Sequence, residues 1–279
     1  MTDSFRLDVR EGIRRAAELG ADGLQVYAVR GEVCPEAMDA SKRREFRAFC
    51  GGLGLEISAL CGDLGGHGFT RLADNPPKIS RSKAIVDLAV DLGTAVVTTH
   101  IGVVPADRSS GVYGTLRAAC RELGEYARSR GVTFAVETGP ETARQLAAFL
   151  RDVDSRGIGA NLDPANLVMV TGDDPVKAVD TLREYIVHTH AKDGVKLAPC
   201  DPQEVYDAYA EGRQDELGVD SFYREVPLGE GQVDFDGYLR ALERIGYRGY
   251  LTIEREVGEN PERDIAAAVA FLKGKLGRR

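Results

Sequence analysis

The chain has 279 residues, a formal net charge of −8 and an isoelectric point near 5.2. Its composition, 43% hydrophobic and 29% charged, is ordinary for a soluble globular protein, and its length suits one large α/β barrel or two small domains. The acidic balance argues against a nucleic-acid partner, whose phosphates favour basic surfaces. The apolar runs are shorter than the ~20 residues of a membrane span, so we expect no membrane partner.

The cysteines indicate a reducing compartment. Their number, five, is odd, and no Cys-x-x-Cys pair occurs, so the sequence indicates neither a disulfide framework nor a structural zinc site. The amino-terminal residues lack the apolar core of a signal peptide. We therefore expect a cytoplasmic protein.

Strands and helices alternate along the chain. An apolar stripe predicts a helix over residues 9–19 that Gly20 ends, and LQVYAV predicts a strand over 24–29. Further strands are expected over residues 55–63, 95–102, 133–139, 158–166, 185–193 and 250–256. The intervening helices are expected over residues 36–53, 80–93, 115–131, 141–153, 173–183, 234–246 and 261–275.

This alternation, with nearly continuous apolar strands, predicts a parallel sheet covered by helices, and hence a (β/α)8 TIM barrel. Such a barrel needs eight strands, and the sequence shows seven. The missing strand must precede the first helix, where only MTDSFR remains. Either residues 1–6 form a short first strand, or the assigned start lies downstream of the true one. We find no linker composition and predict a single domain over residues 1–279.

The segment over about 194–233 is oversized, because loops between strands and helices in such folds usually have 2–6 residues. It carries aromatic side chains among acidic ones, namely Tyr206, Tyr209, Phe222 and Tyr223. A long insertion of this kind is typical of a lid or of an interface, and a homo-oligomer would use it. A short helix that packs on the barrel is an equally good interpretation.

Polar residues mark the ends of four predicted strands. Glu137, Asp163, His190 and Glu254 occupy these ends. The first two are 26 residues apart and the next two 27, about one strand–helix repeat, while 64 residues separate the last two because of the insertion. A single acidic residue there is usually a helix cap, but four in one register predict a shared site. Three carboxylates and an imidazole suit a divalent cation such as Mn²⁺, Mg²⁺, Co²⁺ or Zn²⁺.

The four histidines of the chain all lie at or just beyond predicted strand ends. His188 and His190 alternate along one strand, so their side chains share a face. His100 ends another strand, and we expect it to face the pocket. His67 lies in a glycine-rich loop, where a ligand contact and a surface position are equally expected.

Several stretches resemble the xylose isomerase-like TIM-barrel superfamily, which comprises sugar and sugar phosphate isomerases and epimerases, with endonuclease IV as a relative. These stretches are AVETG, NLDPAN, VHTHAKDG and VPLGEGQVDFDGYLRALERIGYRGYLTIERE. The resemblance extends from about residue 7 to the end of the chain. The endonuclease branch does not fit, because it needs a histidine-rich site for several zinc ions.

The resemblance implies that the four strand-end residues bind the metal and that Glu137 and Glu254 are also the acid/base pair. It places His188 beside the substrate. Asn166 stands where several family epimerases have a substrate-contacting histidine, and this difference argues against ketose-epimerase specificity. Those enzymes also use an arginine for the substrate, and Lys192 or Arg255 could replace it here. The residues expected to contact the substrate are therefore His67, His100, Asn166, His188 and Lys192.

The resulting functional hypothesis is a metal-dependent sugar or sugar-phosphate isomerase or epimerase that works through a metal-bound enediolate. A dehydratase or lyase acting on an inosose, a dehydroshikimate or a 3-keto sugar would use the same metal site. A third hypothesis is a barrel that binds a ligand without catalysis.

Overall fold

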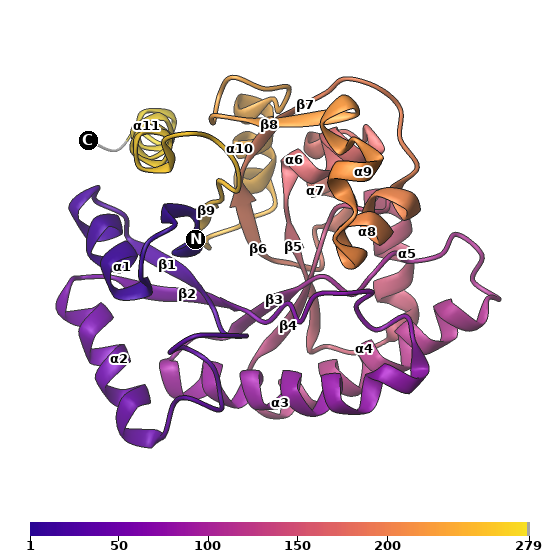
Figure 1. The fold of residues 1–279 in the computed structure, drawn as a ribbon, viewed down its shortest axis with the longest axis horizontal. Helices are drawn as coiled ribbons and strands as arrows, with labels where there is room; N and C mark the ends of the chain where they lie inside the picture. Colours follow the sequence, from indigo (N-terminus) through magenta and orange to yellow (C-terminus); the bar gives the residue numbers. More distant parts are fainter. Residues whose placement is uncertain (278–279) are drawn as a thin grey trace.

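The computed structural model describes residues 1–277 and shows a parallel sheet curled into a nearly closed barrel with helices around it (Figure 1). Within these residues the barrel sheet has seven strands, each parallel to its neighbours. In sheet order they are β1 (Gly23–Tyr27), β2 (Glu56–Cys61), β3 (Val96–Thr99), β4 (Thr133–Glu137), β5 (Ile158–Leu162), β6 (Ile186–Ala191) and β9 (Leu251–Ile253). The predicted TIM-barrel class is confirmed.

The larger helices lie between the strands, as predicted. They are α1 (Val9–Glu18), α2 (Ala40–Gly52), α3 (Asn75–Leu92), α4 (Gly111–Ser129), α5 (Ala143–Val153), α7 (Pro175–Leu182), α10 (Phe235–Arg244) and α11 (Pro261–Lys275). Many begin at a capping side chain; the Thr142 hydroxyl, for example, accepts the Gln145 N–H. Through residue 277, none of the helices has the length and apolarity that crossing a bilayer requires.

The start of one helix was predicted five residues too late. We expected a helix from Ser80, whereas α3 begins at Asn75 and includes Pro76 and Pro77. Proline breaks a helix only in its interior, because the N–H groups of the first turn have no partner within the helix. The two prolines therefore sit where they cost the helix no hydrogen bond.

Alternation along each strand separates two environments. On β1, Leu24 and Val26 are buried in the apolar layer between the sheet and its helices. Gln25 points the other way, into the barrel interior, where it contacts side chains from β3 and β6. The strands thus present apolar residues outward to the helices and several polar residues inward.

The barrel has a seam between β1 and β9, at the place expected for the first strand (Figure 1). Met1 and Thr2 bridge it: the amino group of Met1 donates to the Ile253 carbonyl over 2.7 Å, and the Thr2 N–H donates to the Gln25 carbonyl over 3.0 Å. Asp3–Phe5 then form a 3-10 turn. The expected short first strand is therefore reduced to one backbone hydrogen bond with each neighbour.

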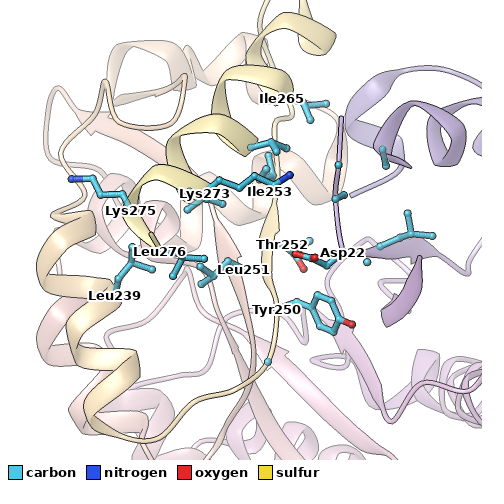
Figure 2. Close-up of a pocket in the computed structure, with 18 of the residues that line it drawn as sticks. Asp22, Leu239, Tyr250, Leu251, Thr252, Ile253, Ile265, Lys273, Lys275 and Leu276 are labelled. Carbon is cyan, nitrogen blue, oxygen red and sulfur yellow. The ribbon is translucent and has the colours of Figure 1, made fainter. Parts of the chain in front are cut away.

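Beside these two residues the seam opens into a cavity of about 890 Å³ (Figure 2). Its walls include apolar side chains from both edges of the sheet and from the helices, among them Leu19, Leu24, Leu251 and Leu272. The ring of Tyr250 lies close to Gly23, and its hydroxyl donates to Glu56 over 2.5 Å. Among the described residues that line the cavity, none of the four strand-end residues appears, so the cavity is distinct from the predicted site.

We predict that an apolar, extended segment of four or five residues, added before Met1, stabilises the protein. It would pair with both open edges of the seam, and two added hydrogen bonds at ~1 kcal/mol each correspond to a rise in Tm of roughly 4–8 °C. Burial lowers the pKa of the Met1 amino group from 8.0 to about 6. The unextended protein therefore loses stability as the pH falls from 8 to 6, and the gain should be larger at pH 6.

Thermal unfolding at both pH values measures this effect. A Gly-Ser extension of equal length is the control, because it removes the same amino group but has a weak preference for a strand. Equal Tm values for the two extensions would contradict strand pairing in the seam.

The predicted insertion has its own structure. The antiparallel strands β7 (Asp193–Lys196) and β8 (Tyr223–Val226) enclose α8 (Pro202–Glu211) and α9 (Gln214–Leu217), drawn in orange in Figure 1. The carboxylate of Asp193 accepts backbone N–H groups from Gly194, Gly229, Gly231 and Val233. This single buried carboxylate therefore fixes the Pro-Leu-Gly-Glu-Gly turn that returns the chain to the barrel.

Candidate metal centre

Four neighbouring strands bring their polar end residues together. Glu137 is the last residue of β4, Asp163 follows β5, His190 lies near the end of β6 and Glu254 follows β9. One ligand atom from each lies within 4.8 Å of the others, and all four side chains are buried. The open carboxyl end of the barrel therefore contains a compact set of three carboxylates and one imidazole.

His190 faces this set through one ring nitrogen. Its Nδ1 is 3.1 Å from Asp163 Oδ2, 3.3 Å from Glu254 Oε2 and 3.5 Å from Glu137 Oε1. Burial by itself lowers the pKa of His190, but the surrounding carboxylates, Glu254 foremost, raise it well above the usual value. In the metal-free protein a proton on Nδ1 therefore occupies the position between the carboxylates.

The donor set fits a divalent cation. Three oxygen ligands and one nitrogen ligand suit Mg²⁺, Mn²⁺, Co²⁺ or Zn²⁺. Of the basic groups nearby, Lys192 donates to Glu254 Oε2 over 3.0 Å and also bonds Glu256. Burial favours the uncharged form of Glu254, but His190 and Lys192 together hold its pKa well below the usual range. A cation can thus replace the proton on His190 beside a Glu254 carboxylate that is already ionised.

Lys192 and Asn166 both adjoin the ligands, as expected from the sequence. The Lys192 ammonium also lies 3.8 Å from Glu225, whereas Arg255 is held by Glu225 at 2.7 Å and is turned away from this role. The Asn166 amide donates to Glu137 Oε1 over 3.3 Å. Lys192 and Asn166 therefore remain candidates for substrate contacts.

His188 lies elsewhere than expected. It is 1% exposed and precedes His190 on β6, so it sits deeper in the barrel. Its Nδ1 is 2.9 Å from Asn161 Oδ1, and its Nε2 is 3.1 Å from Thr252 Oγ1. Burial lowers its pKa well below the usual value, so the ring is neutral. Hydrogen-bond partners within the protein thus occupy both ring nitrogens, so His188 does not lie where the expected substrate contact requires.

His100 stands at the rim of the ligand set. Its Nδ1 is 3.2 Å from Asp63 Oδ2, and its Nε2 is 3.8 Å from Glu137 Oε1. Burial alone would lower its pKa, but Glu137 and Asp63 raise it to about 10. His100 is therefore positively charged near neutral pH in the metal-free protein, and its Nε2 points toward Glu137.

Helix α8 of the insertion covers this rim. The ring of Tyr206 is 5.9 Å from that of His100, and a Cβ placed on Gly139 would lie 2.1 Å from the Tyr206 hydroxyl. His67 joins the glycine-rich loop to the same helix, with Nδ1 3.0 Å from Asp207 and Nε2 3.4 Å from Glu211. The insertion thus lies over the rim of the ligand set, where a lid is expected, and His67 contacts its edge.

We predict that Tyr206→Ala lowers kcat/KM by roughly tenfold, about 1.4 kcal/mol, because the insertion loses its half-buried ring above the substrate side. The affinity for Mn²⁺ should stay unchanged, since Tyr206 is not a ligand. Steady-state kinetics and calorimetry measure the two quantities, and Tyr209→Ala on the exposed side of the same helix is the control. Parallel loss of metal affinity would contradict a role confined to the lid.

Four further residues shape the site, and the sequence interpretation did not assign them to it. Gln25, Asn161, Asp63 and Tyr206 contact His190, Glu137 or His100. Gln25 and Asn161 are polar residues at inward positions of otherwise apolar strands, a signal that was available. Tyr206 belongs to a long insertion whose path depends on tertiary packing.

Residues 13–275 match the family described as Xylose isomerase-like TIM barrel. The chain belongs to this family. The match covers all seven strands of the barrel sheet and the four residues of the candidate metal centre.

Curated relatives include dehydratases. The chain is 27% identical over 251 residues to a 3-dehydroshikimate dehydratase of Pseudomonas putida, which covers 88% of the chain and 35% of the relative. It is 27% identical over 149 residues to an inosose dehydratase of Lacticaseibacillus casei, which covers 50% of the chain and 46% of the relative. The chain thus spans about half or less of the length of these relatives.

Solved structures share the whole architecture. A xylose isomerase domain protein from Planctomyces limnophilus has a TM-score of 0.78 at 29% identity, over 94% of this chain and 90% of that one. A D-tagatose 3-epimerase-like protein has a TM-score of 0.74 at 18% identity, over 98% and 95%. A xylose isomerase-like TIM barrel protein from Mycobacterium smegmatis, in complex with magnesium, has a TM-score of 0.71 at 20% identity, over 96% and 87%.

Proposed function

We propose that this chain is a metal-dependent enzyme that moves a proton at the carbon next to a carbonyl group of a small sugar or polyol. The observation that carries the proposal is the convergence of Glu137 and Glu254, two buried carboxylates, on His190 and Asp163. A bound divalent cation supplies Lewis acidity, which polarises the carbonyl and acidifies the neighbouring C–H.

In the leading version the reaction is an isomerisation or an epimerisation. In an isomerisation, one carboxylate of the pair removes the proton from carbon, which gives an enediolate, and returns it to the former carbonyl carbon while the hydroxyl proton passes to the carbonyl oxygen. In an epimerisation, the other member of the pair, which must be protonated at that step, delivers a proton to the opposite face of the same carbon. Asn166 orients Glu137 through its hydrogen bond to Oε1, and Lys192 holds Glu254 while adding positive charge beside the developing oxyanion. Protons are conserved, so the product has the mass of the substrate.

Dehydration is the second candidate. Its support is the similarity to dehydratases, which for the 3-dehydroshikimate enzyme extends over 88% of the chain. After removal of the C–H proton, the neighbouring C–O bond would break, and the hydroxyl would leave as water with a proton from a donor at the rim. His100, held by Asp63 and 3.8 Å from Glu137, occupies such a position.

One experiment separates these candidates. The Mn²⁺-loaded protein is incubated in D₂O with ketohexoses, with their phosphates, with an inosose and with 3-dehydroshikimate, and the products are analysed by NMR and mass spectrometry. Deuterium at the carbon next to the carbonyl, without loss of mass, supports isomerisation or epimerisation. Loss of one water supports dehydration.

A non-catalytic barrel predicts a different result. Such a protein would bind a sugar or polyol, as thermal shift would detect, without exchange of any carbon-bound proton. Absence of exchange with all four substrate classes, combined with stoichiometric Mn²⁺, would overturn the proposed chemistry and leave the metal site intact.

A further inference from the structure

Gln25 crosses the barrel interior to the back of His190. It lies on β1, which is not a neighbour of β6 in the sheet, and its side chain is fully buried. Its Oε1 is 2.9 Å from His190 Nε2, and its Nε2 donates to Thr98 Oγ1 over 2.7 Å. A buried amide is costly unless hydrogen bonds satisfy it. These two hydrogen bonds satisfy both ends of the Gln25 amide and account for its burial.

The contacts of His190 define which nitrogen is available to a cation. Nδ1 faces the three carboxylates, so a cation among them would bind this atom. A neutral imidazole that ligates through Nδ1 carries its proton on Nε2. Because Nε2 is buried, this proton needs an acceptor inside the barrel.

Two groups lie within hydrogen-bond distance of Nε2 among the described residues. One is Gln25 Oε1. The other is Asn161 Nδ2 at 3.2 Å, but this is an amide nitrogen that already donates to Glu137 Oε2 over 3.0 Å, and it has no lone pair to offer. Gln25 Oε1 is therefore the acceptor, and the hydrogen bond from Gln25 Nε2 to Thr98 Oγ1 holds the other end of the amide.

We propose that Gln25 is a positioning residue for the metal centre, which holds His190 in the tautomer that presents Nδ1 to the cation. The proposal rests on metal binding by the four strand-end residues and is independent of which reaction the enzyme catalyses. It assigns to β1, on the far side of the seam, a direct part in the metal site. Partners of this kind typically contribute 10–100-fold to metal affinity.

Mn²⁺ affinity of the metal-free protein tests this role. Gln25→Met keeps the length of the side chain and removes the acceptor, so we expect the dissociation constant to rise about 10–100-fold. Gln25→Glu restores an acceptor, and we expect affinity within a few fold of the unchanged protein. Thr94→Val is the matched control, because it removes a buried hydroxyl at the opposite end of β3, where Thr94 donates to the Ser58 carbonyl. Its Mn²⁺ affinity should not change.

Each outcome decides the proposal. Unchanged Mn²⁺ affinity in a folded Gln25→Met protein would overturn it, and so would an equal loss in Gln25→Glu. If Gln25→Met does not fold, Thr98→Val replaces it, since release of the Gln25 amide should weaken binding in the same direction; unchanged affinity there overturns the proposal. If the unchanged protein does not bind Mn²⁺, both this proposal and the proposed function are overturned.

Discussion

Glu137→Gln is expected to lower kcat by at least about 10²–10⁴-fold, the usual contribution of a positioned acid or base. The substitution removes the charge that pairs with His190 and the basic oxygen that would accept the proton from carbon. It also places an amide against Asn161 and Asn166, both of which donate hydrogen bonds to Glu137. At least one of these donors would then face another donor.

Glu141→Gln is the matched control for this change. Glu141 lies four residues further along the chain, is also buried, and has a pKa raised to about 8 because burial disfavours its charge. A neutral glutamine therefore resembles its state at pH 7, and we expect activity to persist. Circular dichroism of both variants checks the fold. Retained turnover in metal-loaded Glu137→Gln would defeat its assignment as acid or base.

Binding of Mn²⁺ is expected to release about one proton near neutral pH. The carboxylates outweigh burial and raise the pKa of His190 well above its usual value, so the metal-free protein carries a proton on Nδ1. The cation must displace it. At pH values below this raised pKa, affinity should therefore increase about tenfold per pH unit as the pH rises, equivalent to ~1.4 kcal/mol.

Calorimetry in buffers with different ionisation enthalpies counts the released proton. At a free Mn²⁺ concentration 100 times Kd, the protein should also gain about 2.7 kcal/mol of stability, which raises Tm by roughly 5–11 °C. His190→Gln is the control, because it has no titrating ring and should bind more weakly without proton release. If the Mn²⁺ affinity of the unchanged protein did not depend on pH, the cation would not be displacing a proton from His190.

The sequence by itself determined the class of fold and the convergence of the four candidate metal ligands. Both follow from local regularities: apolar strands alternate with amphipathic helices, and Glu137, Asp163 and His190 recur at about one repeat. In a parallel barrel, residues one repeat apart at strand ends lie at the same height on neighbouring strands. Their proximity therefore depends on the repeat and hardly at all on the details of packing.

The depth of a side chain within the barrel was decided only by the tertiary structure. His188 and His190 share a face of β6, as alternation requires, but one lies a layer below the other and meets Asn161 and Thr252. Alternation specifies the face and says nothing about which layer is open to a substrate. The expected substrate contact of His188 depended on that missing information.

Contacts between segments far apart in the chain also could not be predicted from the sequence. Gln25 reaches His190 across the barrel, and Tyr206 covers His100 from an insertion, because the curvature of the sheet and the path of the lid bring them together. Met1 and Thr2 likewise reach both edges of the seam only in the folded state. Such contacts join residues of large sequence separation, which no local pattern encodes, so only packing of the whole chain could place them.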